Sequence, residues 1–408
     1  MTSESVLSGP APDSAPIMDV DFYSPEVVAN PWPVLREIRE AGPMVWNRRG
    51  HWMTARDPIC RQILNRPGPL GQQGAMAAIF GSEAFISIDD RARHNALRNV
   101  WAPAFRRESL AALSEVIRGF VNRMLDRLEP QLGGGEAANV TAALCEPLPP
   151  SVTAHMLGIP DEMLRSIIEW SADMANATSS GFPIDYERDP AWLAGEAAKR
   201  KLAEFLYEQI KHRRRSSGMD LISLLVHSEV GKTLSEEALM VNVRQMLFAG
   251  TETTQKWLGH IVLVLGRMRE VRCEVIADRA LLPAALEEIM RWETVVQTDP
   301  RGVKGTGVVV AGVPLADGAD MILLLGGANR DPERYPDPDR LDIHREQKAH
   351  LGFGFGLHSC LGVTLARLEA QIATSVLLDR LPNYAVVEPV GYTGFNLRGP
   401  GTIRLVLD

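Results

Sequence analysis

A cysteine at the end of a glycine-rich stretch is the residue of this sequence best suited to metal chemistry. Residues 353–362 read FGFGLHSCLG, and Cys360 comes just before a segment with a helical pattern. The free N–H groups and partial positive charge of a helix N-terminus favour a thiolate over a thiol. A thiolate suits iron, and glycines allow tight turns and close approach to a flat cofactor. The stretch therefore predicts a cysteine that faces a metal or a cofactor.

Two other interpretations of this stretch stay open on the residues alone. In the first, Gly352, Gly354 and Gly356 form a phosphate-binding loop, although strictly alternating glycines do not give the GxGxxG spacing. In the second, Cys360 is a buried structural thiol, which is the usual state of a free cysteine.

An unusual polar run lies in the middle of a long helical pattern. Residues 249–254 read AGTETT. Glycine costs about 1 kcal/mol relative to alanine inside a helix, and threonine is an indifferent helix former. Runs that break local rules are expected where function requires them, and a threonine hydroxyl can bond the carbonyl four residues earlier and bend the helix. The run predicts room for a small ligand, and the alternative is a polar kink on a solvated face.

Two pairs of charged residues have the spacing of a single helix face. Glu288 and Arg291 are three residues apart, and His94 and Arg98 are four apart. Two cationic groups on one face suit carboxylates such as a pair of propionates. The alternatives are a surface ion pair, worth about 0–1 kcal/mol, and a solvated basic face.

Together these stretches resemble the signatures of the cytochrome P-450 family. The 249–254 run is similar to the family's A/G-G-x-D/E-T motif, with Glu252 where aspartate is commoner, and the charged pairs resemble its ExxR and HxxxR motifs. The matches follow the family's order and cover roughly residues 20 to 408. The cysteine stretch fits F-x-x-G-x-H-x-C-x-G at Phe353, Gly356, His358, Cys360 and Gly362.

The resemblance implies a mainly α fold with a minor β part, and haem b between the long central helix and the cysteine-loop helix. Cys360 would be the iron ligand, and Glu252 and Thr253 would guide protons to dioxygen. Glu288, Arg291 and Arg340 would form a network behind the haem. The other implied haem contacts are His94, Arg98, Ala249, Gly250, Arg301, Phe353, His358 and Gly362.

The implied activity is that of a bacterial haem-thiolate monooxygenase, an oxidoreductase that uses dioxygen. The chain has no flavin or nicotinamide motif, so a separate ferredoxin and its reductase would supply electrons, with Arg106, Arg107 and Arg367 as a basic docking patch. The alternatives are a haem-thiolate peroxygenase or isomerase, a haem-based sensor and a nucleotide-binding enzyme. The Glu252–Thr253 pair favours oxygen activation, and the sequence gives no pattern of a sensor output domain.

The substrate is expected to be small and largely apolar, aromatic or terpenoid-like, with one polar group. Positions 245, 248, 249, 252 and 253 share one face of the long helix. Gln245 can equally face another helix. The reaction would be hydroxylation or O-demethylation, and residues 175–190 would form a mobile lid. The predicted substrate contacts are Phe85, Gln245, Phe248, Gln297 and Phe395.

Composition excludes several other classes of protein. The chain has 408 residues and a net charge of −8, which is not that of a bulk nucleic-acid binder. No apolar run approaches the roughly 20 residues that span a bilayer, and residues 1–17 read as a disordered arm without a signal peptide. The four cysteines lie far apart, which suits a reducing cytosol. We therefore expect a cytoplasmic monomer, with residues 18–408 as one domain.

Periodicity predicts the elements that position these residues. Thr233 to Glu236 has the pattern of a capping box at the start of the long helix. A turn signal at Asp317–Gly318 falls among short β segments. The expected elements are a helix over 31–42, a hairpin over 44–54, the long helix over 235–268, β segments over 301–325 and a last helix over 361–381.

Overall fold

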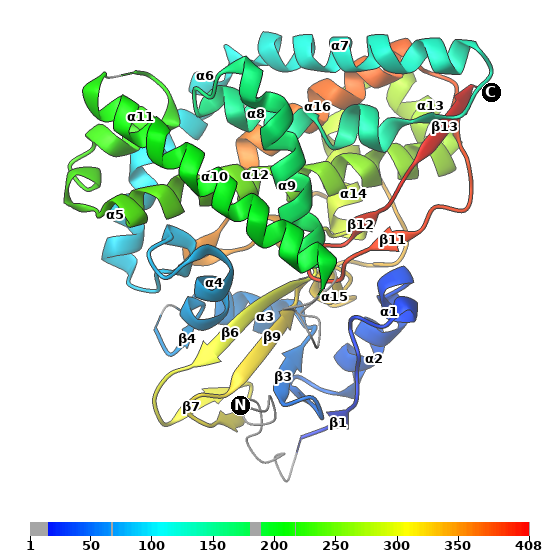
Figure 1. The fold of residues 1–408 in the computed structure, drawn as a ribbon. Helices are drawn as coiled ribbons and strands as arrows, with labels where there is room; N and C mark the ends of the chain where they lie inside the picture. Colours follow the sequence, from blue (N-terminus) through cyan, green and yellow to red (C-terminus); the bar gives the residue numbers. More distant parts are fainter. Residues whose placement is uncertain (1–14, 67, 180–188, 217, 408) are drawn as a thin grey trace. The chain divides into compact units, whose positions relative to one another are not determined.

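The computed structural model describes residues 15–66, 68–179, 189–216 and 218–407 (Figure 1). The chain forms two compact units, each made of separate segments. Unit 1 comprises residues 1–95, 291–341 and 348–360, and unit 2 comprises 96–290, 342–347 and 361–408. The predicted arm lies outside the described residues as far as residue 14, and the predicted lid does so over 180–188. The single-domain organisation stays a prediction.

Unit 1 contains a six-stranded mixed sheet in the order β1-β2-β3-β9-β6-β4. The predicted hairpin is confirmed, because β2 and β3 pair antiparallel with Trp46 opposite Trp52. The two indole rings meet edge to face at 5.3 Å. The strands are β1 (Ile17–Met18), β2 (Val45–Asn47), β3 (His51–Thr54), β4 (Leu70–Gly71), β6 (Thr298–Val303) and β9 (Asp320–Leu324).

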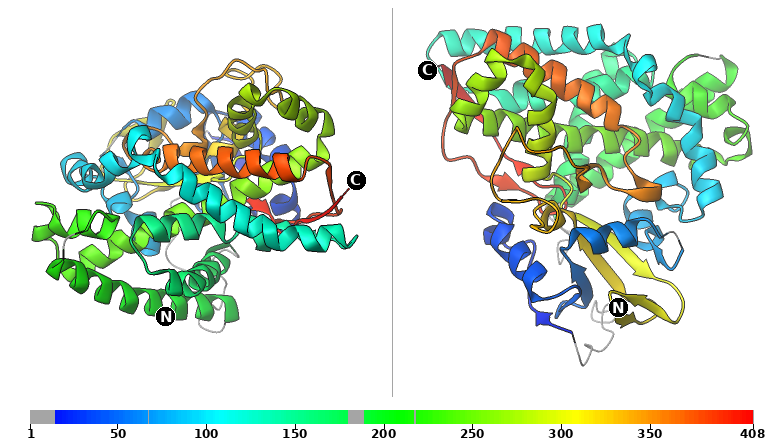
Figure 2. Two further views of the ribbon diagram at one scale, coloured as in Figure 1. Left: turned by 90° about the horizontal axis from the view of Figure 1, so that it is seen from above. Right: turned by 180° about the vertical axis from the view of Figure 1, so that it is seen from behind.

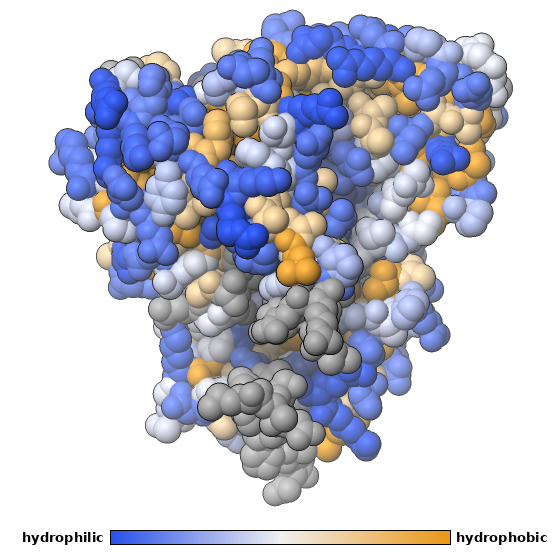
Figure 3. Space-filling view, viewed as in Figure 1, coloured by the Kyte–Doolittle hydropathy of each residue, from blue (hydrophilic) through white to orange (hydrophobic). Residues whose placement is uncertain are grey.

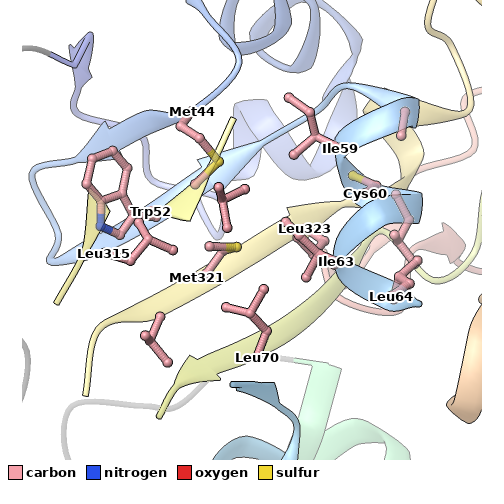
Figure 4. Close-up of a cluster of buried hydrophobic side chains, with 14 of the residues drawn as sticks. Met44, Trp52, Ile59, Cys60, Ile63, Leu64, Leu70, Leu315, Met321 and Leu323 are labelled. Carbon is pink, nitrogen blue, oxygen red and sulfur yellow. The ribbon is translucent and has the colours of Figure 1, made fainter. Parts of the chain in front are cut away.

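The core of unit 1 lies between this sheet and helix α3 (Asp57–Leu64). Figure 4 shows Ile59, Cys60 and Ile63 of α3 directed toward Met321 and Leu323 of β9. All five side chains are buried, and apolar burial of this kind contributes about 25 cal/mol per Å². Burial also raises the pKa of the Cys60 thiol far above its ordinary value, so this cysteine is a neutral core residue.

Shorter elements complete unit 1. Helix α2 confirms the helix predicted over 31–42, and Gly318, at φ +78°, confirms the predicted turn. Strand β6 begins three residues before the β region expected from the sequence. These elements are α1 (Pro25–Ala29), α2 (Trp32–Ala41), α4 (Gln73–Phe80), β7 (Val308–Val310), β8 (Val313–Leu315), α15 (Leu325–Ala328) and the 3₁₀ turns Phe85–Ser87, Leu351–Phe353 and Gly356–His358.

Unit 2 is mostly helical, with two small sheets. Helix α5 (Arg91–Trp101) enters it from unit 1, and α14 (Leu282–Trp292) leaves it. The sheets are β10-β13-β5 and β11-β12, with β5 (Ala138–Asn139), β10 (Tyr384–Val386), β11 (Tyr392–Thr393), β12 (Gly399–Pro400) and β13 (Arg404–Leu407). The other helices are α6 (Arg107–Leu110), α7 (Leu113–Gly133), α8 (Leu148–Met156), α9 (Leu164–Ser179), α10 (Pro190–Arg215), α11 (Leu221–His227), α12 (Glu236–Arg267), α13 (Arg269–Ala277) and α16 (Val363–Arg380). Short helical turns lie at Ala102–Phe105, Thr141–Cys145, Asp161–Met163, Gly231–Thr233 and Arg279–Leu281.

Helix α12 confirms the long helix predicted from the sequence. It is about 48 Å long at 1.5 Å per residue, and α8, α10 and α16 pack against it. The predicted capping box is wrong: Ser235 is the N-cap and accepts a hydrogen bond from the Ala238 N–H at 3.1 Å. Thr233 lies in the preceding 3₁₀ turn, where its hydroxyl donates to the Val230 carbonyl.

Helix α16 confirms the last predicted helix and runs beside α7, as both views of Figure 2 show. Leu365, Ile372 and Val376 are buried as predicted, whereas Leu361 and Leu368 are only half-buried. Hydrophilic residues cover most of the molecular face in Figure 3. Among the residues described, no helix combines the length and the apolar character needed to cross a bilayer.

Candidate functional site

The cysteine loop is a pair of 3₁₀ turns that ends at Cys360. The Cys360 N–H donates to the Phe353 carbonyl at 2.8 Å, which closes the loop. Gly354 and Gly356 have φ of +68° and +73°, a region that favours glycine. Cys360 is exposed, whereas Cys60 and Cys145 are buried, so the interpretation of Cys360 as a buried structural thiol is wrong.

The loop is held in place by other parts of unit 1. A side chain at Gly356 would collide with the Leu64 carbonyl at the end of α3, so the backbone passes close to that helix. The Arg61 guanidinium lies 5.0 Å from the Phe355 ring centroid. Asn329 accepts the Leu351 N–H at 2.6 Å. These contacts fix the backbone before Cys360, and α16 begins three residues after it.

A pocket beside the loop is lined by cationic and polar side chains of unit 1. Arg301 is buried and its Nη2 donates to Oδ2 of Asp299 at 3.1 Å. Gln72 donates to Oδ1 of the same carboxylate at 2.8 Å, and its own Oε1 is buried without a hydrogen-bond partner among the described residues. The basic side chains of this lining, Arg66, Arg301 and His358, suit a ligand with carboxylates. The lining residues are Leu64, Arg66, Leu70, Gln72, Asp89, Arg301, Leu357 and His358.

Asp89 is the acidic member of this pocket and was not identified from the sequence. Its Oδ1 accepts the Gln72 N–H at 2.7 Å, and its Oδ2 accepts from Nζ of Lys304 at 3.0 Å. Nε2 of His358 lies 4.0 Å from Oδ1. The nearby cations therefore offset the charge of Asp89, and the pocket keeps donors for an anionic ligand.

His94 joins the same part of unit 1. It is fully buried, and its ring packs edge to face on His358 with centroids 4.8 Å apart. Phe85, a predicted substrate contact, packs on His94 with ring centroids 5.6 Å apart. Arg98 follows one turn later on α5 and is half-buried. The predicted HxxxR spacing is thus carried by a helix.

The polar run of α12 has the hydrogen bonds that its sequence predicts. The Thr253 hydroxyl donates to the Ala249 carbonyl at 2.9 Å, and the Thr251 hydroxyl donates to the Leu247 carbonyl at 2.7 Å. Gly250 allows close approach of α8, because a Cβ there would lie 3.0 Å from Oγ1 of Thr153. Ala249 is exposed although most of α12 is buried. The run therefore opens a short accessible stretch on a buried helix.

Glu252 is held by a lysine that sequence analysis missed. Its Oε1 lies 2.9 Å from Nζ of Lys256, and the two side chains are 3% and 7% exposed. The i,i+4 spacing on one helix was the available signal. A carboxylate is therefore present at this position of the run together with its counter-ion.

The predicted ExxR pair takes part in two sets of contacts. In unit 1, Arg291 donates to the Asn329 and Pro338 carbonyls, each at 2.9 Å, and to the Arg340 carbonyl at 3.3 Å. The Arg340 side chain is exposed. In unit 2, Glu288 accepts from the Asp342 N–H at 3.0 Å and from Nε of Arg345 at 3.2 Å. Arg345 is a further member of this network that the sequence analysis missed.

Arg345→Ala is expected to lower the free energy of unfolding by about 3 kcal/mol, because it removes a cation that is paired with a buried carboxylate. The Glu288 and Arg345 side chains are 2% and 11% exposed. Urea unfolding of the purified protein measures the change. The control is Arg165→Ala, which breaks an ion pair with 90% and 58% exposed side chains and should leave the midpoint unchanged. Equal midpoints for both variants would contradict the prediction.

The remaining predicted substrate residues have different environments. Gln245 is buried on α12 and Phe248 is half-buried there, while Phe395 is buried in unit 2. Gln297 is buried in unit 1, where its Nε2 donates to the Thr294 carbonyl at 2.5 Å and its side chain covers Gly326. That amide is thus engaged in packing, and all substrate contacts stay predictions.

The predicted docking patch is partly neutralised. Arg367 donates to both carboxylate oxygens of Glu287 at 2.9 and 2.6 Å. Arg106 and Arg107 are exposed at the start of α6.

Comparison with known proteins identifies the family. The family model for Cytochrome P450 matches residues 76–382. Cytochrome P450 monooxygenase PikC of Streptomyces venezuelae is 29% identical over 384 residues, which cover 91% of this chain and 89% of PikC. Cyclomarin C epoxidase CymV of Salinispora arenicola (strain CNS-205) is 30% identical over 378 residues, covering 86% of this chain and 93% of CymV.

Solved structures agree with this match. The crystal structure of CYP109E1 from Bacillus megaterium in complex with testosterone has a TM-score of 0.85 and 27% sequence identity, and covers 94% of this chain and 100% of that chain. The family uses haem, and the exposed Cys360 and the donor-lined pocket fit that cofactor. The mostly helical fold, the family model and relatives matched along nearly their whole length show that this chain is a monooxygenase of the cytochrome P450 family.

Proposed function

We propose that the chain binds haem b through the Cys360 thiolate and hydroxylates or O-demethylates a small, largely apolar substrate. Electrons come from a separate ferredoxin and its reductase. The observation that carries the proposal is the exposed Cys360, which ends a hydrogen-bonded glycine loop beside a pocket that includes Arg66, Arg301 and His358. Haem, when bound, supplies the activation of dioxygen, and the protein supplies orientation and proton control.

The haem propionates are the proposed partners of His94, Arg98, Arg301 and His358. The contact between Asp299 and Arg301 fixes the guanidinium, so it loses little freedom on binding a carboxylate. Hydrogen bonds of Arg291 to the Asn329 carbonyl, and of Asn329 to Leu351, support the backbone leading to the cysteine. Phe353 and Gly362 in the cysteine stretch, and Ala249 and Gly250 on α12, are the remaining proposed haem contacts.

Glu252 and Thr253 are the proposed proton-delivery residues. The Thr253 hydroxyl donates its hydrogen to the Ala249 carbonyl. The lone pairs of the hydroxyl oxygen therefore stay available to accept a hydrogen bond from another group. Glu252 precedes it in the chain and is the carboxyl group of this run that can take up and release a proton. The half-buried Thr253 and the exposed Ala249 leave the Thr253 hydroxyl within reach of a small ligand, while Glu252 stays buried behind it.

An apolar substrate is supported by the side chains near this stretch and by one relative. Phe248 is half-buried one residue before the exposed Ala249. CYP109E1 was crystallised with testosterone, a largely apolar molecule with polar groups at its ends. PikC is named a monooxygenase and CymV an epoxidase. We therefore expect the side chains of each protein's own pocket to determine its substrate. The exposed Arg106 and Arg107 are proposed to meet an acidic face of the ferredoxin.

The test compares two oxidants on two probe substrates, 7-methoxycoumarin and testosterone. A ferredoxin, its reductase, NADPH and dioxygen should support conversion of at least one probe, measured as product by chromatography. Hydrogen peroxide alone should give much less product. Conversion by peroxide only would favour the peroxygenase, and conversion of neither probe by either route would contradict the proposed substrate class.

A further inference from the structure

Lys256 is a buried cation one helical turn after Glu252 on α12. Its Nζ lies 2.9 Å from Oε1 of Glu252 and donates to the Leu397 carbonyl at 2.5 Å. Only 7% of the lysine side chain is exposed. Lysine is rarely buried, because an ammonium taken from water must be paired and hydrogen-bonded to be tolerated. Both contacts therefore matter for this residue.

The chain over 394–399 is shaped to enclose this lysine. A Cβ at Gly399 would lie 2.6 Å from Cγ of Lys256, so only glycine lets the backbone approach the lysine stem. Gly394 has φ of +67°, and a Cβ there would lie 3.1 Å from Nζ. The 394–399 turn thus closes over Lys256, whose ammonium contacts the Leu397 carbonyl and the Glu252 carboxylate.

We propose that Lys256 is a positioning residue that holds the carboxylate of Glu252 for proton delivery. This rests on the proposed function, in which Glu252 passes protons toward Thr253. An acid in a proton route must stay within hydrogen-bond reach of its partner, and an unpaired carboxylate rotates and recruits water. The buried ion pair fixes one oxygen of Glu252 on the helix face. The same ammonium also bonds to the Leu397 carbonyl of the 394–399 turn. Lys256 therefore links the turn to the carboxylate of the proposed proton route.

A purely structural role would be anchoring of the turn, and the chain offers a matched control for it. His260 lies one turn further along α12 and is fully buried. Its Nε2 is 3.1 Å from the Arg398 carbonyl. His260 therefore holds the 394–399 turn through Arg398, whereas Lys256 holds it through Leu397. His260→Phe removes that anchor and leaves the pair of Glu252 and Lys256 in place.

The experiment measures NADPH-driven dioxygen consumption through a ferredoxin and its reductase, in H₂O and D₂O, with no organic substrate added. Lys256→Met should slow consumption about tenfold and enlarge the solvent isotope effect. This is only part of the roughly 10²–10⁴-fold that a positioned proton transfer contributes, because the carboxyl group of Glu252 is still present. Lys256→Arg should restore at least half of the rate, since it keeps a cation. His260→Phe should consume dioxygen at the wild-type rate with the wild-type isotope effect. Haem content and the reduced carbon monoxide spectrum should stay normal in every variant, which confirms folding.

A double mutant separates failure of this inference from failure of the proposed function. Glu252→Gln should show the same defect as Lys256→Met, and the two changes together should be no worse than either one. An effect of Glu252→Gln without any effect of Lys256→Met would overturn the role of Lys256 alone. No effect of Glu252→Gln would overturn the proposed proton route itself. Equal defects in Lys256→Met and His260→Phe would reduce Lys256 to an anchor of the turn.

Discussion

Replacement of Cys360 by alanine is expected to abolish the far-red-shifted Soret band of the reduced carbon monoxide complex. That band is the signature of a thiolate bound to haem iron, and Cys360 is the exposed cysteine at the end of the glycine loop. Monooxygenation of a probe substrate should fall to background in the same variant, since thiolate donation favours O–O cleavage. Difference spectroscopy of the reduced protein with and without carbon monoxide measures the band.

The matched control is Cys273→Ser, which changes the other exposed cysteine, on α13. Its spectrum should equal that of the wild type. A Cys360→Ala protein that keeps the band would show that another group binds the iron, and the function proposed for this chain would then be wrong.

Thr253→Ala is expected to keep haem and the carbon monoxide band but to release most of the reduced oxygen as hydrogen peroxide. The hydroxyl follows Glu252 in the chain and bonds to the Ala249 carbonyl, and alanine removes it without adding bulk. Loss of a positioned group in a proton route costs about 10²–10⁴-fold in the step that it serves. Peroxide released per NADPH consumed, measured with a peroxidase-coupled dye, should rise several-fold.

Thr251→Ala provides the comparison, because Thr251 donates to the Leu247 carbonyl in the same way but is buried. That variant should lose about 1 kcal/mol of stability and release no more peroxide than the wild type. Similar peroxide yields from the two variants would attribute the effect to helix packing and not to a proton route.

The cysteine loop and α12 could be predicted from the sequence because each depends on residues that are close together in the chain. Gly354 and Gly356 are needed for positive φ, and the 3.6-residue periodicity of α12 spans a whole helix. The sequence does not distinguish the two possible N-caps of α12, because Thr233 and Ser235 are both good capping residues and only the backbone conformation selects Ser235.

Contacts between distant segments explain what the sequence could not predict. Arg345 reaches Glu288 across 57 residues, and nothing in its local pattern distinguishes it from other loop arginines. Lys256 reads as an ordinary helix residue until the 394–399 turn is seen to cover it. Gln297 is a polar residue whose environment depends on Gly326, a neighbour supplied by a different segment. Burial and partner choice are tertiary properties at all three positions.

The parallel pairing of β3 with β9 has a consequence for biosynthesis. Trp52 of β3 lies opposite Met321 of β9, so the middle of the sheet forms only after more than three quarters of the chain has left the ribosome. Until then the apolar side of α3, with Ile59 and Ile63, lacks the part of its cover that β6 and β9 provide. Nascent chains that end before residue 320 therefore expose a hydrophobic helix and an unpaired strand edge, and are expected to depend on chaperones to escape aggregation.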